Sequence, residues 1–118
     1  MRIDDLVHFD SPPPAGESFA ADPSRVEHGA PRQTVWNRYS SPCGRFSSGE
    51  WECTPGRWRV QYSEFEYCEI LAGESVLHDE HGGQRHLCPG DRFVIPAGFR
   101  GSWEVLSTCR KVYVIYEP

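Results

Sequence analysis

Apolar and polar side chains alternate along most of this chain in the pattern of short β-strands. The alternation is clearest at residues 57–62, where Trp58, Val60 and Tyr62 would face one side and the polar side chains between them the other. No helical pattern extends beyond two turns. The predicted strands cover residues 34–39, 50–53, 57–62, 66–71, 76–78, 84–87, 92–95, 102–106 and 111–116. Strands at this spacing predict an all-β sandwich or barrel.

Turn chemistry fixes both ends of one predicted strand. The sequence Pro-Gly-Asp at residues 89–91 precedes the strand at 92–95, and Pro-Ala-Gly at 96–98 follows it. Glycine readily adopts a positive φ, and proline fixes φ and removes a donor from the strand ladder. Two glycines at residues 82–83 predict a hairpin turn in the same way.

The first 32 residues differ from the rest, because they carry proline breaks instead of a strand pattern. Three consecutive prolines lie within residues 11–16, and Ala-Ala-Asp-Pro at residues 20–23 adds another break. Such segments favour an irregular or polyproline path. We therefore expect a mostly coil N-terminal arm over residues 1–32, which could include one edge strand, followed by a barrel domain over residues 33–118.

Composition narrows the possible partners and compartments. A chain of 118 residues is long enough for one domain, and its net charge of −5 without a Lys/Arg cluster argues against nucleic acid as a partner. No apolar run approaches the roughly 18–20 residues of a membrane span. The acidic start of the chain is unlike a signal peptide, and five cysteines without C-x2-C spacing fit buried thiols in a reducing cytosol. We expect a soluble cytoplasmic protein with no membrane partner.

Several motifs match one superfamily in order and spacing. Glu66, followed seven residues later by Gly73, resembles the end of the first cupin signature. Gly90, Pro96 and Gly98 resemble the second signature, in which a glycine precedes Pro-x-Gly. This resemblance implies a jelly-roll barrel of two sheets, the RmlC-like cupin fold.

Longer stretches are similar to one group within that superfamily. Residues 49–56, 96–105 and 110–115 resemble the cupin-3 group, single-domain cupins related to ureidoglycine aminohydrolase and the ethanolamine-utilisation cupins. The resemblance covers about residues 47–116. It also implies a homodimer in which the N-terminal arm reaches the neighbouring molecule.

The sequence departs from the family at the metal site. Metal-binding members offer His-x-His, then Glu, then a later His, and these positions fall here on Val60, Tyr62, Glu66 and Gly101. A shift by one residue would place Arg59 and Gln61 at the first two positions instead. Since zinc takes four N, O or S ligands, or three and a water, neither alignment supplies a metal site. We therefore expect no metal and no cofactor.

What remains is a pocket around one carboxylate. If Glu66 points into the barrel, Cys68 follows it inward at period two. Trp103 would share that inner face, and Gly101 would leave room where the family has a histidine. An apolar cavity with few placed polar groups is the usual form of a small-molecule site. The predicted ligand-binding residues are Val60, Tyr62, Glu66, Cys68 and Trp103.

Two functions of different class fit this pocket. The first is a metal-free small-molecule-binding or accessory module. The second is a small-metabolite enzyme, a hydrolase or isomerase with Glu66 as general acid or base, and the related aminohydrolase suggests a nitrogen-rich or ureido-type substrate. A divergent metal-dependent hydrolase or isomerase is a third possibility.

The same residues also fit purely structural roles. Glu66 could pair with Arg45 or Arg100 and join two strands, while Tyr62 and Trp103 could simply fill the core. A second group with metal-ligand chemistry lies on and beside the hairpin at residues 79–83, although an acidic, glycine-rich turn also fits a solvated surface. Its members are His78, His81, His86 and Cys88.

Overall fold

The protein is almost entirely β-structure in a computed structural model that describes residues 1–118. One short 3-10 helix, Ile3–Asp5, precedes the strands, and this three-residue segment is too short to cross a membrane. The strands are β1 (Glu17–Ala20), β2 (Val26–Gly29), β3 (Arg32–Ser40), β4 (Phe46–Cys53), β5 (Gly56–Gln61), β6 (Phe65–Asp79), β7 (Gln84–Leu87), β8 (Arg92–Ile95) and β9 (Arg100–Tyr116). The predicted all-β fold class is confirmed.

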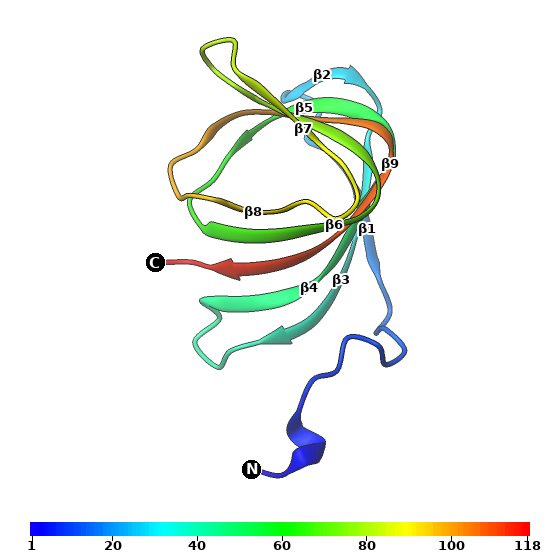
Figure 1. Ribbon diagram of the computed structural model, residues 1–118, viewed down its shortest axis with the longest axis vertical. Coiled ribbons are helices and arrows are strands. Elements are labelled where there is room, and N and C mark those ends of the chain that lie inside the picture. The colour runs from blue at the N-terminus through cyan, green and yellow to red at the C-terminus, as the bar shows by residue number, and fades with distance from the viewer.

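Two long antiparallel strands, β6 and β9, run through one continuous nine-stranded sheet and divide it into two halves, which are called the first and second sheets below (Figure 1). The second half of β9 pairs with β4 through residues 109–116, and its first half pairs with β5 through residues 100–105. The first sheet therefore has the order β1-β3-β4-β9-β6-β8, and the second has the order β2-β5-β9-β6-β7. Together they curl into the half-barrel of a jelly roll.

The two long strands are where the predicted boundaries were wrong. The sequence predicted separate strands at residues 66–71 and 76–78, but β6 continues through Gly73 with register shifts between Ile70 and Ser75. Gly73 has a φ of 76°, and a Cβ there would overlap the carbonyl of Thr108 on β9. The glycine lets the pair of strands bend without breaking. In the same way, the two strands predicted within residues 102–116 are both part of β9.

The core lies between the two sheets and is rich in tryptophan. Trp58 and Trp103 are opposite each other on β5 and β9, and Trp51 of β4 meets the Trp103 ring edge-on, with centroids 5.6 Å apart. Such edge-to-face pairs add to the stability gained from area burial. Three free thiols are fully buried here, whereas Cys43 is exposed and Cys88 is half-buried; the buried ones are Cys53, Cys68 and Cys109.

The first 32 residues contribute one edge strand to each sheet. Strand β1 pairs with β3, and β2 pairs with β5. Before β1 the chain leaves the barrel, and the N-terminus lies well away from the other strands in Figure 1.

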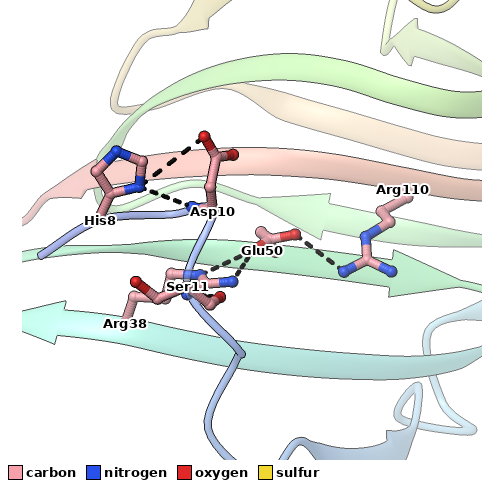
Figure 2. Close-up of polar contacts among 6 residues, drawn as sticks. All are labelled: His8, Asp10, Ser11, Arg38, Glu50 and Arg110. Atoms are coloured by element: carbon pink, nitrogen blue, oxygen red, sulfur yellow. Dashed lines mark hydrogen bonds and ion pairs between the residues drawn. The ribbon is translucent and has the colours of Figure 1, made fainter.

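A buried carboxylate holds part of this arm against the outer face of the first sheet. Glu50 of β4 accepts hydrogen bonds from Arg38 at 2.8 Å and from Arg110 at 2.9 Å, and its side chain is 10% exposed. Figure 2 shows the carboxylate between the two guanidinium groups, with Ser11 beside Arg38. Arg38 also donates to the Ser11 carbonyl at 3.1 Å and lies over the Phe9 ring. The network therefore joins β3, β4 and β9 to the arm.

Replacing Glu50 with glutamine should lower the free energy of unfolding by about 2 kcal/mol, because two guanidinium groups lose a charged partner. Burial raises the pKa of Glu50, but the hydrogen bonds and charges of Arg110 and Arg38 outweigh it and hold this pKa below its ordinary 4.5. The stabilisation is therefore present above pH 4.5 and is lost as the pH falls through the lower folded-state pKa.

Urea unfolding between pH 3 and pH 7 measures this contribution. Wild type should lose more stability on acidification than Glu50→Gln does. Glu52→Gln, on the same outward face of β4, should stay within about 0.5 kcal/mol of wild type at pH 7. If Glu50→Gln and Glu52→Gln lose the same free energy of unfolding at pH 7, the network does not stabilise the fold.

Candidate functional site

The barrel interior contains one ion pair, formed by Glu66 of β6 and Lys111 of β9. The Lys111 Nζ lies 2.7 Å from the Glu66 Oε2, and the two side chains are 6% and 8% exposed, in that order. The strands are neighbours in the first sheet, and Glu66 is opposite Ile115. Both residues occupy inward positions of the alternating strands, so the long lysine side chain reaches along the sheet to the carboxylate.

Two indole rings surround the ammonium group. The Lys111 Nζ lies 4.3 Å from the centroid of the Trp103 ring and 4.7 Å from that of Trp51. Cations within about 6 Å of a ring face are attracted by its quadrupole. Burial alone would lower the pKa of Lys111, but the Glu66 carboxylate outweighs it, and the pKa of Lys111 is raised. The interior therefore carries a fixed positive charge over the physiological pH range.

One oxygen of Glu66 makes two short contacts. Oε2 accepts from Lys111 and from the Cys68 thiol, whose Sγ lies 3.0 Å away. Burial raises the pKa of Cys68 to about 12, so the thiol acts as a neutral donor at pH 7. These two short contacts leave the Glu66 side chain 8% exposed, and the residue also lines a neighbouring cavity.

A cavity of about 360 Å³ opens beside the pair and is bounded mainly by β3, β4 and β9. Polar groups at its mouth are linked, since the Tyr113 hydroxyl donates to Asn37 at 2.7 Å and the Asn37 amide donates to Ser40 at 2.9 Å. Burial and the nearby carboxylate raise the pKa of Tyr113 to about 12, so this hydroxyl stays protonated. The lining residues are Val35, Asn37, Ser40, Gly44, Ser47, Trp51, Glu66, Lys111, Tyr113 and Ile115. We call this space the Glu66 cavity.

The structure brings only part of the predicted site together. Glu66 and Cys68 are in contact and face inward, and Trp103 stacks on Lys111 but is 1% exposed and does not line the Glu66 cavity. Tyr62 and Val60 instead line a separate depression of about 310 Å³. Burial raises the pKa of Tyr62 and keeps its hydroxyl neutral. The aromatic walls beside Glu66 belong to Trp51 and Tyr113, which the sequence did not single out.

Lys111 is the functional residue that sequence reasoning missed. The candidate partners of Glu66 were Arg45 and Arg100, but Arg45 is exposed and Arg100 lies 3.8 Å from Glu80 at the surface. A signal was present in the alternation of β9, where residues 109, 113 and 115 are inward-facing cysteine, tyrosine and isoleucine. A lysine at an inward position of that series would be buried, and a buried ammonium group needs a partner of opposite charge.

The positions of the usual cupin metal ligands do not fit a metal here. Val60 and Tyr62 offer no nitrogen, and Glu66 Oε2 is committed to Lys111 and Cys68. Gly101 does not leave room for a ligand, because a Cβ there would overlap the carbonyl of His78. The side chains at these positions therefore do not form a metal site.

The histidines of the β6–β7 hairpin point to separate partners. His78 pairs with Glu104 at 2.9 Å, and His86 pairs with Glu74 at 3.1 Å. In the register of the hairpin His86 is opposite Val76 and His78 is opposite Gln84, so the two histidines do not face each other. No group of three or more His, Cys, Asp or Glu side chains is arranged to hold a metal ion.

Comparison with known families decides the family. The model of the EutQ-like cupin domain matches residues 40–113, well over half of the chain. The protein belongs to the EutQ-like cupin family. The resemblance to the cupin-3 group, stated from residues 47–116, is thereby confirmed, and so is the cupin jelly-roll fold. A search of curated proteins by sequence finds no match.

Solved structures with the same fold include proteins of this EutQ-like cupin family. A protein of unknown function from Pseudomonas syringae pv. tomato, assigned to the DUF861 family, superposes with a TM-score of 0.78 at 21% identity, over 86% of this chain and 44% of that one. EutQ from Clostridium difficile gives 0.66 at 19% identity, over 74% and 64%. A putative ethanolamine utilization protein Q from Salmonella typhimurium gives 0.66 at 16% identity, over 87% and 96%.

The chain spans less than half of the Pseudomonas protein and less than two thirds of the Clostridium EutQ. At these identities the likeness extends to the fold, while function must be argued from the site itself.

Proposed function

We propose that this EutQ-like cupin is a metal-free small-molecule-binding module and that its ligand occupies the Glu66 cavity. The observation that carries the proposal is the buried Glu66–Lys111 ion pair, both residues of which line this cavity. A charged pair in a cavity with aromatic and aliphatic walls is the arrangement of a specific small-molecule site.

The chemistry of the cavity favours one class of ligand. An N–H or O–H donor would meet the Glu66 carboxylate, and the apolar part of the molecule would lie against Trp51, Val35 and Ile115. Because Lys111 neutralises Glu66, the cavity has no net charge from this pair and suits a neutral or zwitterionic compound. Ureido and other nitrogen-rich metabolites have such donors.

A thermal-shift screen of small metabolites tests the proposal, since a compound that binds only the native state raises its stability, by about 2.7 kcal/mol at one hundred times its Kd. We expect at least one nitrogen-rich or ureido compound to raise the Tm. Val35→Phe should abolish this shift by filling the cavity. Val94→Phe is the matched control, because Val94 is 61% exposed on β8 outside the cavity, and it should keep the shift. Loss of the shift in both variants would contradict the location.

The second candidate is an enzyme in which Glu66 is the general acid or base. The short contact to Lys111 weighs against it, because Glu66 would have to leave this ion pair to exchange a proton. Glu66→Gln separates the two functions. An enzyme should lose turnover in this variant, whereas a binding module should keep much of its affinity.

We also propose that the protein forms a homodimer in the cytoplasm. Unpaired edges at β1 and β8 support association, and so does an exposed stacked pair of rings, Phe65 and Tyr116. The five free cysteines support a reducing compartment. Light scattering at tens of micromolar should give twice the 13.4 kDa monomer mass, and the monomer mass would contradict the dimer.

A further inference from the structure

A second cavity, of about 570 Å³, lies on the outer face of the second sheet and shares no lining residue with the Glu66 cavity. Its floor is formed by β5 and the start of β9, where Arg59 is opposite Ser102 and Gln61 is opposite Arg100. The chain before and within β2 forms one wall, and the end of β6 forms the other. We call this cavity the arginine trough, after Arg25, Arg57, Arg59 and Arg100.

Positive charge is concentrated in the trough although the protein as a whole is acidic. Four of the 12 Lys and Arg residues of the chain line it, while the net charge is −5. The alternation of β5 turns Arg57 and Arg59 outward because Trp58 and Val60 pack toward the core between them. The overall charge of the protein therefore does not account for this patch.

Two of the three carboxylates in the trough accept short hydrogen bonds, and one of them pairs with a trough arginine. Glu27 Oε1 accepts from Arg57 Nε at 3.0 Å and also from the Ser102 hydroxyl. Asp79 Oδ1 accepts from the backbone N–H groups of His81 and Gly83 at 2.7 and 2.8 Å. Glu27 therefore neutralises Arg57, and the other three guanidinium groups of the trough share only Asp79 and Glu80.

The remaining guanidinium groups are free or loosely paired. Arg25 makes no side-chain hydrogen bond or ion pair, and Arg100 lies 3.8 Å from Glu80 with both side chains more than half exposed. Arg59 is positioned by the turn beside it, since its Nη2 donates to the Ser24 carbonyl at 3.1 Å and its backbone N–H donates to the Arg25 carbonyl at 2.9 Å. These bonds hold Arg59 against the turn that contains Arg25, so the two arginines lie close together before a ligand binds.

We propose that the arginine trough binds a small phosphorylated anion, with Arg25, Arg59 and Arg100 as its ligands. The planar guanidinium fork matches two phosphate oxygens at once, and charge-assisted hydrogen bonds of this kind are about twice as strong as neutral ones. The polar lining, in which Val60 is the one hydrophobic residue, fits a diphosphate group better than an apolar body.

Titration of the 15N-labelled protein with inorganic pyrophosphate, in a buffer without phosphate and at about 0.1 M salt, tests this site. We expect saturable shifts of the backbone amides at residues 24–27, 57–61 and 100–102. Arg25→Gln and Arg59→Gln should each raise the Kd at least tenfold. Arg92→Gln is the matched control, because Arg92 is an exposed arginine on β8 of the first sheet. It should leave the Kd unchanged.

Two results would overturn the proposal. One is a titration that does not saturate, and the other is an equal loss of affinity in Arg92→Gln, since both would mean unspecific attraction to surface charge. If Arg59→Gln lowers the Tm, Arg25→Gln decides the question, because its guanidinium group holds nothing else in place. Val35→Phe, which fills the other cavity, should bind pyrophosphate like wild type, and weaker binding would contradict two separate sites.

Discussion

Replacing Lys111 with methionine should lower the free energy of unfolding by about 3–5 kcal/mol. Methionine is one atom shorter than lysine and keeps most of the packing between Trp51 and Trp103, but it leaves the Glu66 carboxylate buried beside a neutral group. Removing one partner of a buried pair exposes the full desolvation cost of the other. Urea unfolding at pH 7, followed by tryptophan fluorescence, measures the loss as a lower midpoint at unchanged slope.

The double variant Glu66→Leu/Lys111→Met separates this cost from lost packing. Buried ion pairs replaced by apolar residues of similar volume are often neutral or stabilising by 1–4 kcal/mol, so the double variant should recover most of the loss and approach wild type. Arg45→Met, at an exposed position, should change stability by less than about 0.5 kcal/mol. A double variant no more stable than Lys111→Met would contradict this account. Recovery would mean that the pair is present for a purpose other than stability.

The second large effect is expected at Gly101, where alanine should cost about 3 kcal/mol or more. A Cβ at this position overlaps the carbonyl of His78, a backbone atom of the neighbouring strand β6, and it also comes within 3.1 Å of the Phe99 ring. Backbone cannot move as a flexible side chain does, so the strain must spread along β6 and β9. Thermal unfolding of Gly101→Ala measures the effect as a lower Tm.

Gly82→Ala is the control for replacing a glycine with alanine where the new Cβ meets no other atom. Gly82 has a φ of 85°, but no atom lies within 4 Å of its Cβ position, so alanine there should cost only about 1–2 kcal/mol from backbone strain. If Gly101→Ala is as stable as wild type, β9 can move away from β6, and the position could accept a larger residue. That result would reopen the histidine position of metal-binding cupins.

The fold could be predicted from local features because turns and alternation act over a few residues. The Pro-Gly-Asp turn before β8 and the alternating face of β5 both lie where the sequence placed them. The bend of β6 at Gly73 could not be predicted, since a glycine that ends a strand and a glycine that lets a strand bend past its neighbour look alike. Only the position of Thr108 on the partner strand distinguishes them.

The site could be predicted only in part, because a pocket depends on contacts between distant strands. Alternation correctly turned Glu66 and Cys68 inward, yet it could not show that Lys111, 45 positions away, would reach the same carboxylate. Trp103 likewise faces inward as expected, but Lys111 separates it from the Glu66 cavity. Gly101 shows the same limit, since the space freed by its missing side chain is filled by the His78 carbonyl.

The most direct test of the central claim compares ligand affinity in wild type and in Glu66→Leu/Lys111→Met. The compound with the largest thermal shift in the metabolite screen is titrated into both proteins by calorimetry, after circular dichroism has shown that both are folded. The account predicts that the double variant binds at least tenfold more weakly, because the carboxylate of Glu66 and the ammonium group of Lys111 are gone. Equal affinity in the two proteins would contradict a ligand site at the Glu66–Lys111 pair.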